Sequence, residues 1–241
     1  MKPWQKKGWC IPPQQSAAFV CAMEDVLQVY ARAYNPLRPQ ICLDEAAKQI
    51  LAEVRAPLPI KPGQVERVDN EYVRQGTCTL FMLFEPLAGK RVVQVRERRT
   101  AVEFAQVVEH LCETMYPGAE KIVLVLDNLN THGPHSLYEA FAPEQARRLA
   151  ERIEWHYTPR HGSWLNMAEI ELSALSSQGL AERMGSREHL EREVAAWEAA
   201  RNTASVKVNW RFTMQEAGNK LKRLYPSILP SEGTIDTDMT F

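Results

Sequence analysis

The sequence predicts an α/β protein in which a mixed sheet is flanked by helices, and three observations lead to this prediction. Two extended runs at 77–84 and 91–96 are separated by a short turn-rich connector, which indicates an antiparallel hairpin. The continuous apolar run at 121–126 is typical of a strand that is buried on both faces. Helical segments alternate with the later strands, as crossover connections between parallel strands do.

The remaining elements complete one order along the chain. A helix at 16–34 is expected to end at Asn35-Pro36, and a short strand follows it and ends at Asp44. After the hairpin, a capping box at Thr100-Ala-Val-Glu103 opens a helix. Further elements are expected at 134–141, 143–152, 153–157, 164–180 and 186–201. This succession of a three-strand hairpin region and crossover helices matches a ribonuclease H-like fold.

Composition divides the chain into three segments. Residues 1–36 begin with prolines and lysines and are expected to form an extended arm and a lead-in helix. Residues 37–226 are expected to form the ribonuclease H-like domain, a size that suits a chain of 241 residues. Residues 227–241 show no apolar periodicity and are expected to form a disordered tail.

The composition is that of a globular protein, and the charge limits how it binds partners. Hydrophobic residues make up 45% of the chain and charged residues 24%. There is no apolar run of about 18 residues and no signal-peptide pattern, so we expect a cytoplasmic protein without membrane contact. The formal net charge of −1 argues against stand-alone high-affinity DNA binding, because such affinity comes largely from neutralising phosphates. A catalytic domain whose DNA-binding module lies elsewhere is compatible with this charge.

The five cysteines are widely spaced and include no Cys-x-x-Cys pair. The sequence therefore supports neither a zinc knuckle nor a disulfide framework. Cys42 and Cys78 lie in strand-like runs and are expected in the core.

Three carboxylates stand out because each follows or opens a predicted element. Asp44 follows the first short strand, Asp127 closes the apolar strand, and Glu169 opens the helix expected at 164–180. Ligands of α/β sheets bind beyond the carboxyl ends of strands, so these side chains can converge there. Mg²⁺ and Mn²⁺ prefer hard oxygen ligands, and two such ions can act together on a phosphodiester bond. The pattern therefore predicts a site for two divalent ions.

Each carboxylate has a local alternative. Asp127 alone fits a cap for the turn that follows it. Glu45 stands beside Asp44 and could equally be the acid that matters. Glu169 and Glu171 flank opposite sides of one apolar helical stripe, so periodicity does not choose between them.

Two histidines are second candidates for this site. His132 follows Asp127 by five residues, and His161 lies in the segment Pro159-Arg-His-Gly-Ser163. Imidazole can ligate a metal, position a substrate or make a structural hydrogen bond. We expect one of the last two roles for each of them.

Two motifs carry a resemblance to a known family. They are Val125-Leu-Asp-Asn-Leu-Asn-Thr-His132 and Tyr157-Thr-Pro-Arg-His-Gly-Ser-Trp-Leu-Asn-Met-Ala-Glu169. Through them the chain resembles transposases of the insertion-sequence-630 group, within the mariner-type superfamily, from Trp4 to Pro226. Further matching stretches lie in order at 9–12, 41–45, 84–89, 97–100, 208–212 and 222–226.

The resemblance implies a ribonuclease H-like domain with an aspartate–aspartate–glutamate triad. By motif, the first two acids are Asp44 and Asp127. The third is Glu169, because the family's last acid comes three residues after the asparagine that is Asn166 here. The triad would hold Mg²⁺, with Mn²⁺ as a substitute, and two ions are expected. The candidates for positioning the substrate are Asn128, His132, His161 and Asn166.

The activity implied by the resemblance is DNA transposition. Cleavage at the transposon ends would free a 3′-hydroxyl, which would attack target DNA at TA dinucleotides. Double-stranded DNA and a second copy of the chain are the expected partners. The alternatives are a ribonuclease H-like nuclease without strand transfer, and an inactive remnant that serves as a dimerisation or regulatory partner.

Two departures from the family pattern bear on that activity. Family members carry an N-terminal helix-turn-helix region that reads the transposon ends, whereas the motifs here begin in the linker, so a shortened or split protein is expected. The family has Lys-Pro after its first Asp-Glu, and this chain has Ala46-Ala47. Loss of that lysine would weaken a phosphate contact without removing a metal ligand.

Overall fold

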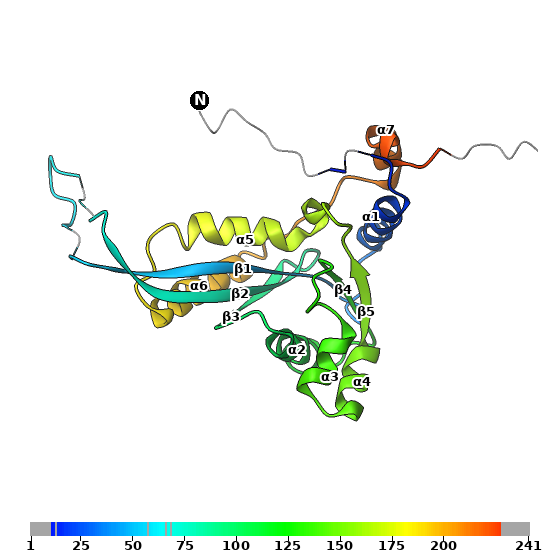
Figure 1. Ribbon diagram of the computed structural model, residues 1–241, viewed down its shortest axis with the longest axis horizontal. Coiled ribbons are helices and arrows are strands. Elements are labelled where there is room, and N and C mark those ends of the chain that lie inside the picture. The colour runs from blue at the N-terminus through cyan, green and yellow to red at the C-terminus, as the bar shows by residue number, and fades with distance from the viewer. Residues whose placement is uncertain (1–10, 13, 57, 66, 68, 228–241) are drawn as a thin grey trace, which may run out of the picture.

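A five-stranded mixed sheet organises the molecule (Figure 1). The computed structural model describes residues 11–12, 14–56, 58–65, 67 and 69–227, so most of the expected N-terminal arm and nearly all of the expected tail lie outside the described residues. The strand order is β3-β2-β1-β4-β5, with antiparallel pairing among the first three strands and parallel pairing of β1 with β4 and of β4 with β5. The strands are β1 Gln40–Glu53, β2 Tyr72–Glu85, β3 Lys90–Arg96, β4 Ile122–Leu126 and β5 Ile153–Tyr157. The predicted mixed sheet is confirmed.

Helices cover both faces of this sheet. They are α1 Ala17–Tyr30, α2 Ala101–His110, α3 Pro134–Ala140, α4 Pro143–Arg152, α5 Met167–Gln178, α6 Arg187–Thr203 and α7 Met214–Lys220. The core on one face combines Cys42, Cys78 and Val125 with α1, α5, α6 and α7, and both cysteines are buried as predicted. The core on the other face combines Leu43 and Leu124 with α2, α3 and α4. Every helix of the described residues is too short or too polar to serve as a transmembrane span.

β1 and β2 are both longer than predicted. β1 runs on past Asp44 to Glu53, and β2 begins at Tyr72 rather than at residue 77. The two strands stay paired over this length, so each satisfies the backbone groups of the other where no third strand is present. Asp44 therefore lies inside a strand, and the prediction that it ends one is wrong.

The helix boundaries also differ from the prediction. Residues 163–165 form a 3₁₀ turn, and α5 begins only at Met167 because the side chain of Asn166 caps it. α1 ends at Tyr30, before the predicted end at residue 34. α7 is a short helix that the sequence analysis did not predict.

β1 and β2 extend beyond the sheet as a two-stranded arm, which ends in the connection at 54–71 (Figure 1). The register shifts between Ile50 and Leu51, opposite Gly76. Gly76 has a φ of 117°, a conformation that favours glycine, and such irregularities bend a strand. Large apolar side chains are exposed along the arm, at Val54, Leu58, Ile60, Val65, Tyr72 and Val73.

The loop between α5 and α6 braces the base of the arm. The backbone N–H of Leu51 donates to the carbonyl oxygen of Met184 at 2.8 Å. The guanidinium of Arg183 lies 3.0 Å from Oε2 of Glu53 and donates to the carbonyl oxygen of Asp69 at 2.7 Å. Arg183 therefore holds both chain segments of the arm together.

Replacing Arg183 with alanine should loosen the base of the arm while the domain stays folded. The lost contacts act only on the arm, so local opening should become easier by about fivefold, as expected for the loss of about 1 kcal/mol. Hydrogen–deuterium exchange of the peptide covering 69–74 measures this effect. Arg192→Ala, at an exposed position of α6, is the matched control. Equal exchange in both variants would show that strand pairing alone holds the arm.

Candidate metal centre

The register of the sheet brings Asp44 level with Asp127. β1 pairs in parallel with β4, and Cys42 lies opposite Val125. Asp44 and Asp127 each come two residues later on these neighbouring strands. β4 ends at Leu126 while β1 continues, so the two carboxylates lie where this parallel pairing stops. This is the edge of an α/β sheet at which ligands bind.

The pleat of β1 separates Asp44 from its neighbour Glu45, because successive side chains of a strand point to opposite faces. Asp44 shares a face with Cys42, which packs in the core of α1 and α5. Glu45 shares a face with Leu43, which packs in the core of α2. The two adjacent acids therefore meet different partners.

Asn166 joins the start of α5 to β1. Its Nδ2 donates to the carbonyl oxygen of Leu43 at 2.8 Å and to Oδ2 of Asp44 at 3.3 Å. Its Oδ1 accepts from the backbone N–H of Ala168 at 3.1 Å and so caps the helix. Glu169 lies in the first turn of that helix and is exposed. Asn166 is only 1% exposed, and the substrate-positioning role expected for it stays a prediction.

His132 bridges Glu45 and Asp127. Its Nδ1 bonds to Oδ1 of Asp127, and its Nε2 lies 3.0 Å from Oε2 of Glu45. The ring stacks on Phe104, with centroids 4.7 Å apart, and is buried, yet the residue also lines an open cavity, and its substrate-positioning role stays a prediction. Burial lowers the pKa of His132, but the hydrogen bonds to the two carboxylates outweigh it and raise the pKa to about 9. In this state His132 holds the two carboxylates in place through its two ring nitrogens.

Asp127 and Asp44 differ in their electrostatics. Burial raises the pKa of Asp127, but the hydrogen bond with His132 outweighs it and holds the pKa below its usual value. Burial raises the pKa of Asp44 to about 7, although the backbone N–H of Glu45 donates to its Oδ1 at 2.8 Å. The charges of Asp127, Glu45 and Glu169 also raise the pKa of Asp44. Asp44 is therefore within electrostatic reach of both other acids of the predicted triad.

This cluster fits a hard divalent cation. Carboxylate oxygens are the ligands that such ions prefer, and a cation would relieve the repulsion that acts on Asp44. Within the described residues, ligand atoms of Glu45, Asp127 and His132 lie within 4.8 Å of one another. Oε2 of Glu45 is buried and makes no hydrogen bond of good geometry, despite its nearness to His132. These three residues therefore form a candidate site for a divalent cation.

Glu171, the alternative to Glu169 on α5, is fully buried. Its carboxylate lies 3.0 Å from the guanidinium of Arg91 and 2.7 Å from that of Arg201. It lies about 200° around the helix from Glu169 and faces β3 and α6. Periodicity could not separate the two acids, but the sequence Asn166-Met-Ala-Glu169 resembles a helix-capping signal and marks Glu169 as a residue of the first turn.

Asn128 and His161 lie at exposed positions near the centre. Asn128 lines an open cavity of about 520 Å³, together with Asn130, His135 and Tyr157. His161, in the loop after β5, has a φ of 64°. Such a conformation is uncommon for a residue other than glycine and is found at functional sites. Asn128 follows β4 and His161 follows β5, two neighbouring parallel strands, and their substrate-positioning roles stay predictions.

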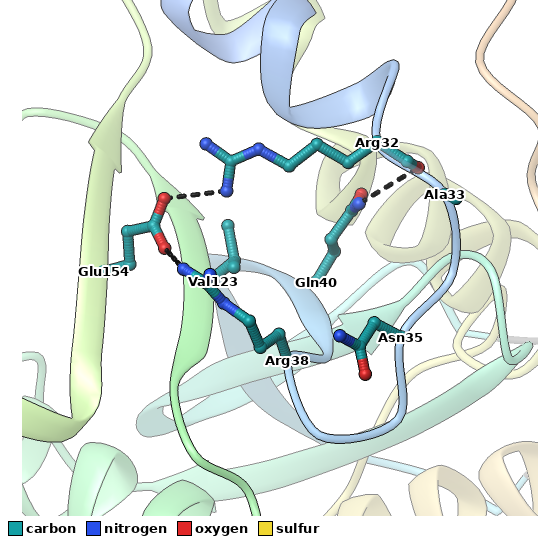
Figure 2. A pocket seen from close by; sticks show the side chains of 7 residues that line it. All are labelled: Arg32, Ala33, Asn35, Arg38, Gln40, Val123 and Glu154. Atoms are coloured by element: carbon teal, nitrogen blue, oxygen red, sulfur yellow. Dashed lines mark hydrogen bonds and ion pairs between the residues drawn. The ribbon is translucent and has the colours of Figure 1, made fainter.

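A second polar cavity, of about 320 Å³, lies at the opposite edge of the sheet (Figure 2). Arg32 and Arg38 follow α1, and their guanidinium groups lie 2.7 Å and 2.5 Å from the carboxylate of Glu154 on β5. His156 also contacts Glu154, at 3.0 Å. Because both arginines pair with Glu154, we interpret this cavity as a structural connection between the end of α1 and β5.

The contribution of Glu154 to stability should depend on pH. Burial raises the pKa of Glu154, but hydrogen bonds from Arg32, His156 and Arg38 outweigh it and lower the pKa to about 2. A group with a lowered folded-state pKa stabilises the fold above its unfolded pKa of about 4.5, and this contribution is lost as the pH falls toward 2. After allowance for solvent screening, Glu154→Gln should cost about 1–2 kcal/mol at neutral pH.

Urea denaturation checks this prediction. The difference in unfolding free energy between Glu154→Gln and the native protein should narrow between about pH 5 and pH 3. Glu151→Gln, at an exposed position of α4, should show no such change. A difference that stays constant with pH would contradict the role of the ionised carboxylate.

Asn166→Ala should destabilise the domain by about 2–4 kcal/mol, because it removes a helix cap and two hydrogen bonds to β1. Urea denaturation at neutral pH measures the loss. Asn209→Ala, at an exposed position, should cost about 0.5 kcal/mol or less. An equally small cost for Asn166→Ala would refute the joining role of this side chain.

Comparison with known proteins identifies the family of this chain. A family model described as DDE superfamily endonuclease matches residues 39–191, a range that includes Asp44, Asp127 and Glu169. A search of curated proteins finds no significant match.

Solved structures of Mos1 complexes share the fold. The Mos1 strand transfer complex aligns with a TM-score of 0.55 and 16% identity, over 84% of this chain and 61% of the Mos1 chain. The Mos1 mariner paired end complex with Mn aligns with a TM-score of 0.54 and 18% identity, over 86% and 63% of the two chains. The paired end complex with Mg has a TM-score of 0.52 and 17% identity, over 94% and 69%.

At these identities the likeness concerns the fold, and it confirms the predicted ribonuclease H-like fold. The chain spans 61% of the length of the Mos1 chain in the strand transfer complex. The family match covers most of the chain and includes the strands and the helix that carry the clustered acids. This chain therefore belongs to the DDE superfamily endonucleases.

Proposed function

We propose that this chain is the catalytic domain of an insertion-sequence-630 group transposase. It would cleave DNA at transposon ends and join the freed 3′ ends to target DNA. The observation that supports the proposal is that Asp44 and Asp127 lie level on neighbouring strands, within reach of the charge of Glu169, in a chain of the DDE endonuclease family. The assignment to this group rests on the motifs at 125–132 and 157–169.

In this proposal Asp44, Asp127 and Glu169 hold two Mg²⁺ ions, for which Mn²⁺ can substitute. Their carboxylate oxygens are the ligands that both ions prefer. When bound, two such ions activate the attacking water or hydroxyl and stabilise the leaving oxygen of the phosphodiester. The descriptions of two solved relatives name Mn and Mg, which supports this choice of ions.

The surrounding residues prepare the carboxylates for this task. His132 keeps Asp127 ionised through their hydrogen bond. Asn166 orients Asp44 by donating to its Oδ2. Since metal binding requires the ionised carboxylate, the proton that Asp44 holds near neutral pH must leave when the site fills.

Double-stranded DNA, at the transposon ends and at the target, is the proposed substrate. Asn128 and His161 are exposed near the centre and would contact the DNA. Arg99 is exposed 3.9 Å from the carboxylate of Glu45 and could meet a phosphate. Two relatives are described as a paired-end complex with a transposon end and as a pre-cleavage transpososome. TA dinucleotides as the target follow from the resemblance alone.

We also propose a homodimer, because joining two transposon ends needs two active sites. The exposed apolar side chains of the arm offer a surface for contact with a partner. A helix-turn-helix region that reads the transposon ends belongs to the same proposal. The domain limits at 36 and 226 and the cytoplasmic location stay predictions.

Asp127→Asn should abolish Mn²⁺-dependent nicking of a supercoiled plasmid. Loss of a ligand that supplies several kcal/mol of transition-state stabilisation should lower the rate by roughly 100-fold or more. Gel electrophoresis of nicked and closed plasmid measures the rate. Glu120→Gln, at an exposed position just before β4, should nick at the native rate. Native nicking by Asp127→Asn would refute the proposed function.

Two further measurements separate the alternatives. Donor oligonucleotides with a free 3′-hydroxyl should be joined to target DNA by a transposase, whereas a simple nuclease would nick without joining. Calorimetric titration with Mn²⁺ should show binding that Asp127→Asn weakens. No binding by the native chain would favour the inactive remnant.

A further inference from the structure

Glu171 of α5 is buried in a cluster of charged groups that the proposed chemistry does not use. We propose that Glu171, held by Arg91 and Arg201, is a positioning residue that sets the rotation of α5 and thereby aims Glu169 at the metal centre. This inference rests on the proposed function, because it concerns the third acid of the proposed triad. It gives the buried cluster a role beyond stability.

The cluster joins three elements of the fold. Arg201 of α6 binds Glu171 through two nitrogens, with Nε 2.9 Å from Oε2 and Nη2 2.7 Å from Oε1. Arg91, at the start of β3, places its Nε 3.0 Å from the same Oε2. A two-pronged pair of this kind fixes the orientation of a carboxylate as well as its position. The side chains of Glu171 and Arg91 are fully buried, so water does not compete for these contacts.

Arg91 is itself held in place. Its Nη2 donates to the carbonyl oxygen of Val206 at 2.5 Å. Its backbone N–H and carbonyl oxygen both bond to the side-chain amide of Asn202, at 2.9 Å and 2.8 Å. Its guanidinium lies over the ring of Phe84, 5.0 Å from the centroid. The partner of Glu171 is therefore a fixed anchor on the sheet.

The buried face of α5 carries apolar side chains as well as Glu171. Ala168 and Leu175 are fully buried there, whereas Ile170, the neighbour of Glu171, is 44% exposed. Neighbouring residues of a helix are about 100° apart around its axis, so a turn by one position would bury Ile170 but expose Ala168 and Leu175. The ion cluster around Glu171 therefore locks the rotation that the apolar side chains also favour.

Glu169 lies between two anchors of α5. Asn166 joins the start of the helix to β1, and Glu171 joins its next turn to β3 and α6. A turn by one position would carry Glu169 about 100° around the helix axis and change its distance to Asp44. The second anchor therefore keeps Glu169 on the side of the helix that faces the centre.

Calorimetric titration of the full 241-residue chain with MnCl₂ tests this role. Arg201→Met leaves Arg91 and Glu171 as a charge-balanced buried pair, so the domain should fold. We expect Mn²⁺ affinity to fall roughly 10-fold or more, as when outer partners of metal ligands are removed, with an unchanged circular dichroism spectrum. Ser173→Ala, at an exposed position of the same helix, is the matched control and should bind as the native chain does. Unchanged affinity in Arg201→Met would overturn the proposal.

A labelling experiment gives a readout that needs no metal. In an Ile170→Cys protein, the rate at which a thiol reagent modifies position 170 should change about fivefold once Arg201→Met is added, because the exposure of that position depends on the rotation of the helix. Peptide mass spectrometry measures the two rates, and equal rates would overturn the proposal. A native chain that binds no Mn²⁺ would count against the proposed function, and the labelling rates would still decide the role of Glu171.

Discussion

Repulsion among clustered carboxylates is the constraint on which the arrangement of the centre depends. The charges of Glu45, Asp127 and Glu169 all act on Asp44, which is also partly withdrawn from water. Like charges at short range oppose folding unless other contacts hold them together. His132 reduces the repulsion between Glu45 and Asp127, because its positively charged ring lies between the two carboxylates. The clustered charge is therefore a feature that the rest of the fold must stabilise until a cation binds.

The pleat of β1 divides this work between the two faces of the sheet. On the α2 face, the His132 ring is buried against Phe104 and holds Glu45. On the α5 face, Asn166 and the cluster around Glu171 hold the helix that carries Glu169. Both sets of contacts are buried, and a low local dielectric strengthens hydrogen bonds there. Asp127, with 39% of its side chain exposed, lies at the boundary of the two sets and stays open to a ligand.

The elements that the sequence predicted well are those with strong local signals. The hairpin connector at 85–90 and the wholly apolar run at 121–126 are local features, and the mixed sheet followed from them. The full length of β1 depends on its pairing with β2, and the paired residues lie far apart in the sequence. The local sequence around Asp44 does not show this pairing, so the predicted strand was too short.

In the candidate site, too, the sequence predicted the local features and missed the contacts between distant segments. The step from Asp127 to His132 spans five residues and could be seen in the motif, but the link from His132 to Glu45 crosses two elements. The choice between Glu169 and Glu171 depended on arginines on β3 and α6, which helical periodicity cannot show. Contacts between distant segments are therefore what separated the acids near the centre from the acid in the core.

The centre and the arm depend on the same two elements. β1 carries Asp44 and continues into the arm, and the segment after α5 contacts β1 between these two places. Lys48 donates to the carbonyl oxygen of Leu180 at 2.7 Å, and Leu51 donates to that of Met184 at 2.8 Å. Two contacts spaced along both segments resist sliding and rotation better than one contact does. A force on the arm would therefore act on β1, which carries Asp44, and on the segment that follows α5, the helix that carries Glu169 in its first turn.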